Sequence, residues 1–263
     1  MTAEPVLDGH PLAPVRQLAN KVPEVTVYFW IIKVLTTGMG ETASDVLART
    51  LGPIPAVALG GLALVASLAV QFTLRRYVAR AYWTAVVMVS VFGTMAADVL
   101  HVGLGVPYAV STPAFLVVLT AVFALWYASE QTLSIHTIRT RRREAFYWAA
   151  VLATFALGTA TGDLTATVGF GYLGSVALFS AAMCVPALAH RFGALGAVTA
   201  FWTAYVITRP LGASLADWMA LPHTRGGLGL GLAPVTLAWT VAIIGFVGYL
   251  AVSQRDRGAH AAA

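Results

Sequence analysis

The sequence predicts an all-α membrane protein in which eight transmembrane helices form four tandem two-helix repeats. Three observations lead to this fold class. The 263 residues are 59% apolar and only 10% charged, which is outside the usual range of a soluble domain. Apolar runs long enough to cross about 30 Å of hydrocarbon recur along the whole chain. One spacing of tryptophan, glycine and aspartate also appears four times.

Each apolar run has about 18 residues or more, the length that a membrane-spanning helix needs. The predicted spans are 25–47, 54–74, 81–103, 110–131, 145–167, 171–189, 195–217 and 231–253. A single transmembrane domain at 25–254 is therefore expected between cytoplasmic tails at 1–24 and 255–263. The first tail has no apolar core, so no cleaved signal peptide is expected.

Basic residues identify the cytoplasmic side. The opposite side has only Arg49 and Arg225. The loops and tails on the cytoplasmic side carry Arg16, Lys21, Arg75, Arg76, Arg80, Arg139, Arg141, Arg142, Arg143, Arg191, Arg255 and Arg257. This asymmetry follows the positive-inside rule and places both termini in the cytoplasm. The net charge of +5 is therefore a signal of membrane topology, and no nucleic-acid partner is expected.

The internal repeat is visible as an ungapped register. From Trp30, Gly40 lies at +10, Ser44 at +14 and Asp45 at +15. The same steps from the other marker tryptophans, Trp83, Trp148 and Trp202, reach Gly93, Ala97 and Asp98; Gly158, Gly162 and Asp163; and Gly212, Ala216 and Asp217. The repeats cover about 25–77, 78–138, 144–192 and 195–254. All four first helices run outward, so the repeats are parallel, and we expect pseudo-symmetry between the four hairpins.

Three segments carry a family resemblance: "KVPEVTVYFWIIKVLTTGMGETASD", "SIHTIRTRRREAFYW" and "TRPLGASLADW". With them the chain resembles a family of uncharacterised bacterial multi-pass membrane proteins. That family is built from four tandem two-helix repeats of unknown function, each marked by a tryptophan. The resemblance implies a protein of the bacterial cytoplasmic membrane. It implies no activity, so the function must be argued from residues.

Two faces of each first helix can be separated. Positions +10 and +14 carry small residues, which allow helices to approach closely in lipid. Positions +7, +11 and +15 lie on one stripe, and ten of its twelve residues are polar. The stripe is Thr37, Glu41 and Asp45; Ser90, Thr94 and Asp98; Phe155, Thr159 and Asp163; and Arg209, Ala213 and Asp217. Such a stripe cannot face lipid, so it is expected to face the interior or a water-filled path.

The charge of this stripe suggests transport. Five acids face one cation, Arg209, and a low-dielectric site cannot hold four uncompensated carboxylates. Either some are protonated or cations enter, so the leading hypothesis is a transporter or exchanger for a hard divalent cation, with protons as counter-ion. Oxygen ligands suit Mg²⁺, Mn²⁺ or Ca²⁺, and Mn²⁺ is weakly preferred. The assigned residues are a ring of Asp45, Asp98, Asp163 and Asp217, Glu41 below it, auxiliary oxygens from Thr37, Ser90, Thr94 and Thr159, and Arg209 as counter-charge.

Two alternatives stay open. In a non-transporting membrane scaffold, the aspartates would anchor helices to backbone groups of the adjoining loops. In a carrier for a small organic cation, the aromatic residues would matter more. The chain shows no nucleophile–base constellation and no complete metalloenzyme motif, so neither an enzyme nor a resident cofactor is expected. The expected partners are the lipid bilayer and the transported cation or proton, and the sequence does not fix an oligomeric state.

Several single residues carry more specific expectations. Arg209 lies about 10 Å beyond Trp202 by helical rise, and Glu41 only about 6 Å higher, so the two should form an ion pair. Lys33 is only about 4.5 Å from Trp30 by the same rise and is expected to reach the cytoplasmic interface, where Glu130 could meet it. The marker tryptophans are expected in an interfacial belt. His101 is expected to be an interfacial side chain, although it could join a softer metal site.

Overall fold

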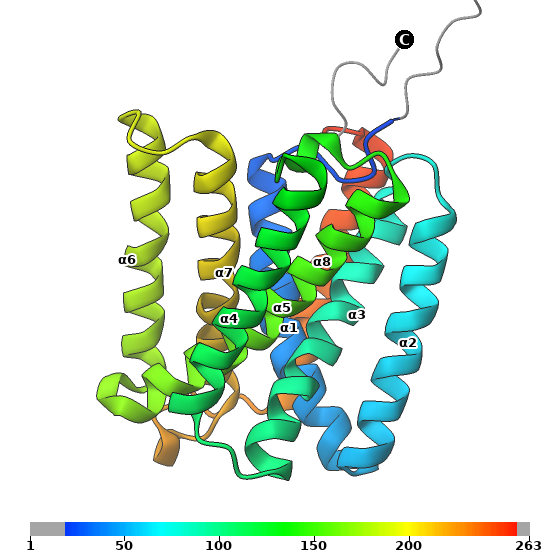
Figure 1. The fold of residues 1–263 in the computed structure, drawn as a ribbon. Helices are drawn as coiled ribbons and strands as arrows, with labels where there is room; N and C mark the ends of the chain where they lie inside the picture. Colours follow the sequence, from blue (N-terminus) through cyan, green and yellow to red (C-terminus); the bar gives the residue numbers. More distant parts are fainter. Residues whose placement is uncertain (1–18, 257–263) are drawn as a thin grey trace, which may run out of the picture.

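The computed structural model describes residues 19–256, which form helices, the segments that connect them, and short stretches before the first helix and after the last. Eight long helices follow one another along the chain (Figure 1). They are α1 (Val27–Leu51), α2 (Pro53–Thr73), α3 (Ala79–Asp98), α4 (Tyr108–Glu130), α5 (Arg141–Thr165), α6 (Gly171–Arg191), α7 (Ala197–Ala220) and α8 (Leu232–Ser253). Most of the two predicted tails, with Arg16 and Arg257, lies outside the described residues.

Short helical turns complete the connections. The π-helical turns Val99–Gly103 and Ala166–Phe170 extend α3 and α5, and 3₁₀ turns lie at Ile135–Thr137 and His223–Arg225. Within the second π-helical turn Gly169 has φ +112°, a conformation that a residue with a Cβ rarely adopts. The chain can therefore reverse there between α5 and α6 with almost no loop.

The described chain includes several segments with the length and apolar character of membrane spans. They are Pro53–Thr73, Ala79–His101, Tyr108–Glu130, Arg141–Arg191 and Leu232–Ser253, and the 51-residue segment contains both α5 and α6. Helices α1 and α7 fall outside this group because Lys33, Glu41 and Asp45, and Arg209 and Asp217, interrupt them. The chain is thus a multi-pass membrane protein by the composition of its helices.

The odd-numbered helices form a closed ring. Helix α1 packs against α3 and α7, and α5 also packs against α3 and α7. Most residues buried in helices belong to these four. The even-numbered helices expose large apolar side chains, among them Ile54, Val117, Val185 and Val241. The ring is therefore the interior of the protein, and the even helices are the surface that suits lipid.

Each even helix packs mainly on the odd helix of the next repeat. Helix α2 lies on α3, α4 on α5, α6 on α7, and α8 closes the circle on α1, whereas contacts inside one sequence repeat are sparser. The two helices predicted as one hairpin are therefore splayed apart. The order of contacts repeats around the ring, and pseudo-symmetry of the four units stays a prediction.

The glycine ten residues after each marker tryptophan explains how the ring closes. A Cβ added to any of them would lie less than 3 Å from a side chain seven residues after the next marker tryptophan, and the fourth glycine meets the first repeat. The four pairs are Gly40 with Ser90, Gly93 with Phe155, Gly158 with Arg209 and Gly212 with Thr37. The predicted close approach at +10 is confirmed, and it joins consecutive repeats into a circle.

This packing predicts that alanine substitutions at two glycines on one face of α5 have very different effects on stability. An alanine methyl at Gly158 would lie 2.2 Å from Cγ and 2.5 Å from Cβ of Arg209, whereas at Gly162 the nearest atom is 3.6 Å away. We expect Gly158→Ala to lose about 1–3 kcal/mol of stability through overpacking. Gly162→Ala should be neutral or slightly stabilising, because alanine favours the helix. Melting curves in detergent compare the two, and equal melting temperatures would contradict the ring geometry.

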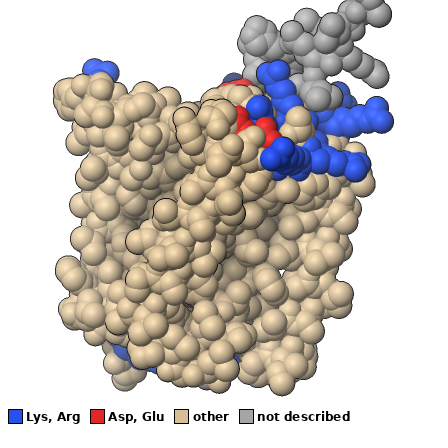
Figure 2. Space-filling model, viewed as in Figure 1, with Lys and Arg blue, Asp and Glu red and all other residues tan. Residues whose placement is uncertain are grey.

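The two ends of the molecule differ in charge (Figure 2). At one end, where α8 finishes, Lys and Arg side chains gather; we call this the basic end. Arg75, Arg76, Arg139 and Arg142 are exposed residues of its loops and helix ends. The four repeated aspartates lie near the opposite ends of the odd helices, which we call the acidic end. Between the ends, the face in Figure 2 shows no charged side chain.

Candidate functional site

The polar stripes of the four odd helices face the centre of the ring, as predicted. All eight residues at positions +7 and +11 are buried, and the four aspartates at +15 are half-buried. The +7 and +11 residues are Thr37, Glu41, Ser90, Thr94, Phe155, Thr159, Arg209 and Ala213. A polar axis therefore runs through the ring towards the acidic end.

Arg209 ties the four helices together at the middle of this axis. Its side chain is completely buried. Nη2 lies 2.8 Å from Oε2 of Glu41 in α1 and 2.8 Å from Oγ1 of Thr159 in α5. Nη2 also donates to Thr94 of α3, and Nη1 donates to the Thr37 carbonyl at 3.1 Å. The predicted ion pair between Arg209 and Glu41 is confirmed.

The predicted auxiliary oxygens divide into two groups. The hydroxyls of Thr94 and Thr159 accept from Arg209 and lie 3.5 Å from Oε2 of Glu41. The Thr37 hydroxyl instead donates to the Val34 carbonyl at 2.6 Å, and the Ser90 hydroxyl donates to the Thr36 carbonyl at 2.8 Å. Only the first pair is therefore placed to contact a ligand that replaces Arg209 at Glu41.

Three of the four aspartates have no cationic partner. Asp45 pairs with the exposed Arg49 at 3.2 Å. Asp98, Asp163 and Asp217 form no ion pair and accept no hydrogen bond from a backbone group within residues 19–256. Each of the three lies within electrostatic range of Glu41 and Asp45. The acidic end thus brings four carboxyl groups together, and only that of Asp45 forms an ion pair in the part of the chain that the structure describes.

The carboxylates do not converge on a single point. No three His, Cys, Asp or Glu side chains among the described residues come close enough to hold a metal ion directly. Oε1 of Glu41 has no hydrogen-bond partner in this part of the chain. The Tyr108 hydroxyl approaches Asp163, and Tyr172 and Asp217 are within electrostatic range. Because the carboxylates do not converge on one point, they suit a cation that keeps its water molecules better than one that has lost them. Mg²⁺ is such an ion, since it loses its waters reluctantly.

Lys33 lies elsewhere than the sequence predicted. Its side chain is 1% exposed, and Nζ has no hydrogen-bond partner within the described residues. The ammonium lies 4.0 Å from the ring centre of Phe155 and 3.9 Å from that of Tyr205. The expected reach to the interface is wrong because Phe155 and Tyr205 supply a cation–π site inside the ring.

Glu130 does not meet Lys33 either. It pairs with Arg143 at 2.7 Å and with Arg142 at 3.4 Å. These residues join the end of α4 to the start of α5 at the basic end. Glu130 therefore stabilises a helix connection and leaves Lys33 without a carboxylate.

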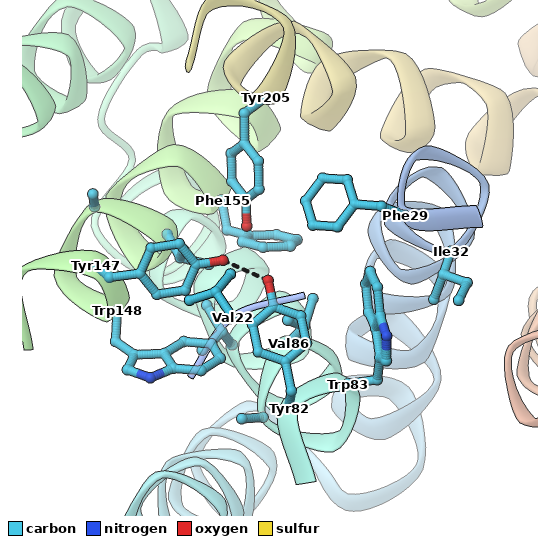
Figure 3. Close-up of a cluster of buried hydrophobic side chains, with 14 of the residues drawn as sticks. Val22, Phe29, Ile32, Tyr82, Trp83, Val86, Tyr147, Trp148, Phe155 and Tyr205 are labelled. Atoms are coloured by element: carbon cyan, nitrogen blue, oxygen red, sulfur yellow. Dashed lines mark hydrogen bonds between the residues drawn. The ribbon is translucent and has the colours of Figure 1, made fainter. Parts of the chain in front are cut away.

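An aromatic layer closes the axis on the basic side of Lys33 (Figure 3). The hydroxyls of Tyr82 and Tyr147 form a hydrogen bond, and that of Tyr205 points into the same central space. Trp83 and Trp148 are buried in this layer. The Trp83 ring packs on Phe29 of α1 and the Trp148 ring on Tyr82 of α3, so these two indoles face neighbouring helices, and their place in an interfacial belt stays a prediction.

The segment before α1 seals the basic end. The backbone of Lys21 donates to the Ile138 carbonyl, that of Glu24 to Asp256, and that of Tyr77 to Asn20, all at 2.9 Å. The buried Lys21 side chain forms an ion pair with Glu144, which also accepts from Gln71 at 3.2 Å. Residues 20–24 thus join the α2–α3 loop, the α4–α5 loop, α5 and the C-terminal segment across the basic end of the ring.

His101 has a structural place beside the acidic end. Its Nδ1 lies 2.9 Å from the Val106 carbonyl and its Nε2 lies 3.2 Å from the Ser111 hydroxyl. The imidazole ring also packs on Tyr108. Both nitrogens are therefore engaged in the turn between α3 and α4, and the softer metal site that His101 could have joined is not formed.

Comparison with known families agrees with the repeat register. The family described as Repeat of Unknown Function (DUF347) matches the chain four times in tandem, over residues 28–77, 81–132, 146–193 and 200–256. The chain belongs to this family. No curated protein and no solved structure matches it. In each copy of the DUF347 repeat, the match includes the marker tryptophan, the +10 glycine and the +15 aspartate.

The register of the DUF347 repeat also contains a signal for the buried position of Lys33. Continuing the polar stripe one turn back from +7 gives position +3, which is Lys33, Val86, Val151 and Tyr205. All four are buried at the axis. Extending the periodicity by one turn would therefore have placed Lys33 and Tyr205 inside the ring.

Proposed function

We propose that this protein transports cations across the bacterial cytoplasmic membrane along the axis surrounded by α1, α3, α5 and α7. The observation that carries the proposal is that the carboxyl groups of Asp98, Asp163 and Asp217 form no ion pair within the described residues. Three half-buried carboxylates without cationic partners are costly in a low-dielectric site, unless cations or protons reach them. They surround the entrance to an axis whose next charged groups are Glu41 and Arg209.

All eight helices are proposed to cross the bilayer. Helices α1 and α7 lie inside the ring, where neighbouring helices shield their polar stripes from lipid. The basic end lies in the cytoplasm by the positive-inside rule, so both termini are inside and the acidic end faces outward. In this arrangement the aspartates attract cations from outside, while the aromatic layer and residues 20–24 keep the inner side closed.

The proposed substrate is a hard divalent cation, Mg²⁺ or Mn²⁺, with protons moving as the counter-ion. The site offers carboxylate and hydroxyl oxygens, which such ions prefer. The ion would enter hydrated, held through its waters by the aspartates. It would then compete with Arg209 for Glu41, with the Thr94 and Thr159 hydroxyls beside it.

A small organic cation is a second candidate for one reason. The Phe155 and Tyr205 rings already hold an ammonium group, that of Lys33, at cation–π distance. This aromatic site lies deeper than the aspartates, beyond the Arg209–Glu41 pair. An organic cation would therefore need both to pass the pair and to displace Lys33.

Uptake into proteoliposomes tests the proposal. Purified protein should take up Mn²⁺ or Mg²⁺ at a saturable rate well above that of protein-free vesicles, whereas tetramethylammonium and K⁺ should enter slowly. Uptake of tetramethylammonium alone would favour the organic-cation carrier. Vesicles that take up none of these ions, although they contain folded protein, would favour the non-transporting scaffold.

A further inference from the structure

Lys33 occupies a position that the proposed cation path does not explain. It is a completely enclosed amine one helical turn before Thr37 on the stripe that leads to Glu41. Its Nζ has two aromatic faces and no hydrogen-bond acceptor among the described residues. An ammonium in such a place is far more costly than an amine. Buried lysines are accordingly groups that exchange protons readily.

The charged neighbour of Lys33 is Arg209. The Arg209 guanidinium carbon lies 5.0 Å from the ring centre of Phe155, the same ring that Lys33 contacts at 4.0 Å. Glu41 is the acid that offsets these two cations. While Glu41 holds Arg209, one positive charge is neutralised. When a cation binds Glu41 instead, Arg209 is left unpaired beside Lys33, and two positive charges share one aromatic ring.

The other titratable groups directed to this part of the axis are tyrosines. They are Tyr205 of α7, Tyr147 of α5 and Tyr82 of α3 (Figure 3). Helix α2 contains no titratable residue, and α8 contains only Tyr249, which packs against Tyr28. No acid therefore shares the layer of Lys33, and the charge on Lys33 depends on Arg209 and Glu41.

The tyrosines also give Lys33 a connection to the basic end. The Tyr205 hydroxyl lies close to that of Tyr147 and interacts with it, although the two do not reach the geometry of a full hydrogen bond in the described chain. Tyr147 is hydrogen-bonded to Tyr82, whose ring packs on Tyr77. The Tyr77 hydroxyl bonds Asp256 at the end of the described chain. Hydroxyls can pass protons, so the tyrosines offer Lys33 a proton route to the basic end.

We infer that Lys33 is the proton-carrying group that couples cation transport to proton movement, and that it receives its proton from the basic end through the tyrosine layer. This inference rests on the proposed function. When the incoming cation takes Glu41 from Arg209, the Lys33 ammonium breaks one N–H bond, keeps the electron pair as an amine, and passes the proton to water on the side of the acidic end. When the cation leaves towards the basic end, Glu41 recovers Arg209 and Lys33 regains a proton from the basic end, so that one proton moves outward as one cation moves inward.

The test compares proton and Mn²⁺ movement in proteoliposomes that contain a pH indicator and a Mn²⁺ indicator. In the wild type, each Mn²⁺ that moves should be accompanied by proton movement in the opposite direction. Lys33→Met removes the proton site but keeps an unbranched side chain between the Phe155 and Tyr205 rings. We expect it to lose the coupled proton movement, and we expect Lys33→Arg, which keeps a fixed charge beside Arg209, to stop both fluxes.

A binding measurement keeps the inference testable if Lys33→Met transports nothing. In weakly buffered detergent, wild-type protein that binds Mn²⁺ should release about one proton more per ion than Lys33→Met, by linkage. Equal proton release, or an unchanged ratio of proton to Mn²⁺ flux in Lys33→Met, would overturn the inference. Mn²⁺ transport by the wild type without any proton movement would also overturn it while leaving the proposed function intact. If the wild type moved no cation, both the proposed function and the inference about Lys33 would be contradicted.

Discussion

Replacing Arg209 with methionine is expected to destabilise the protein more than any other single change on the axis. Arg209 is completely buried and bonds residues of α1, α3 and α5 at once. Without it, Glu41 keeps a buried charge with no cation, and breaking a buried pair in this way costs about 3–5 kcal/mol. We expect a large fall in the melting temperature measured in detergent.

The double variant Glu41→Gln/Arg209→Met separates charge from shape. It removes both members of the ion pair, so no uncompensated charge is left, and replacement of both partners is often close to neutral. We expect it to recover most of the stability that Arg209→Met loses. It should still fail to transport cations, because the acid below the aspartates is gone. If the double variant were as unstable as the single one, Arg209 would act through packing alone.

The sequence predicted the contents of the axis better than it predicted the contacts around it. An ungapped register from Trp30 to Trp202 identified the four helices that meet and the face on which they meet. Helical rise placed Arg209 and Glu41 at similar depths. The free-energy cost of an unpaired guanidinium inside the membrane then predicted that the two would pair. These features follow from one-dimensional spacing, which α-helices preserve in space.

Contacts between repeats could not be predicted in the same way. The two helices of each sequence repeat were expected to pack on each other as a hairpin, but α2 lies mainly on α3 of the next repeat and α8 returns to α1. Lys33 was placed at the interface because its depth near Trp30 allows a lysine to reach out. Its true position depends on Phe155 and Tyr205 from two other repeats, and continuing the polar stripe to position +3 shows only that Lys33 faces inward, not which side chains surround it.

The aspartates were predicted as a ring of metal ligands, and the structure supports a looser arrangement. Their carboxylates face a common region near Glu41, yet no three of the described acids, histidines or cysteines converge on one ion. Distance between side chains at one depth depends on how widely the helices spread. The +10 glycines, where consecutive helices approach most closely, lie more than one turn before the +15 position, and the sequence does not contain the helix separation at that depth.

Asp98→Asn and Asp163→Asn are expected to reduce cation flux by at least about tenfold, equivalent to about 1.4 kcal/mol per ion-binding step. Each change keeps the shape of the side chain while removing a charge and a proton site. Neither carboxylate accepts a backbone hydrogen bond in the described chain, so neither variant is expected to lose a bond to a loop backbone. A neutral amide is cheaper to bury than a carboxylate, and the folded state should therefore keep its stability.

The most direct test of cation transport through this axis measures Mn²⁺ flux and melting temperature on the same preparations of wild type, Asp98→Asn and Asp163→Asn. Asp45→Asn is a matched comparison, because Asp45 already has the cationic partner Arg49 and should matter less. Cation transport through the axis predicts much lower flux per folded molecule for Asp98→Asn and Asp163→Asn at an unchanged melting temperature. A lower melting temperature with unchanged flux per folded molecule would show that the acidic layer is architecture, and would contradict the proposed function.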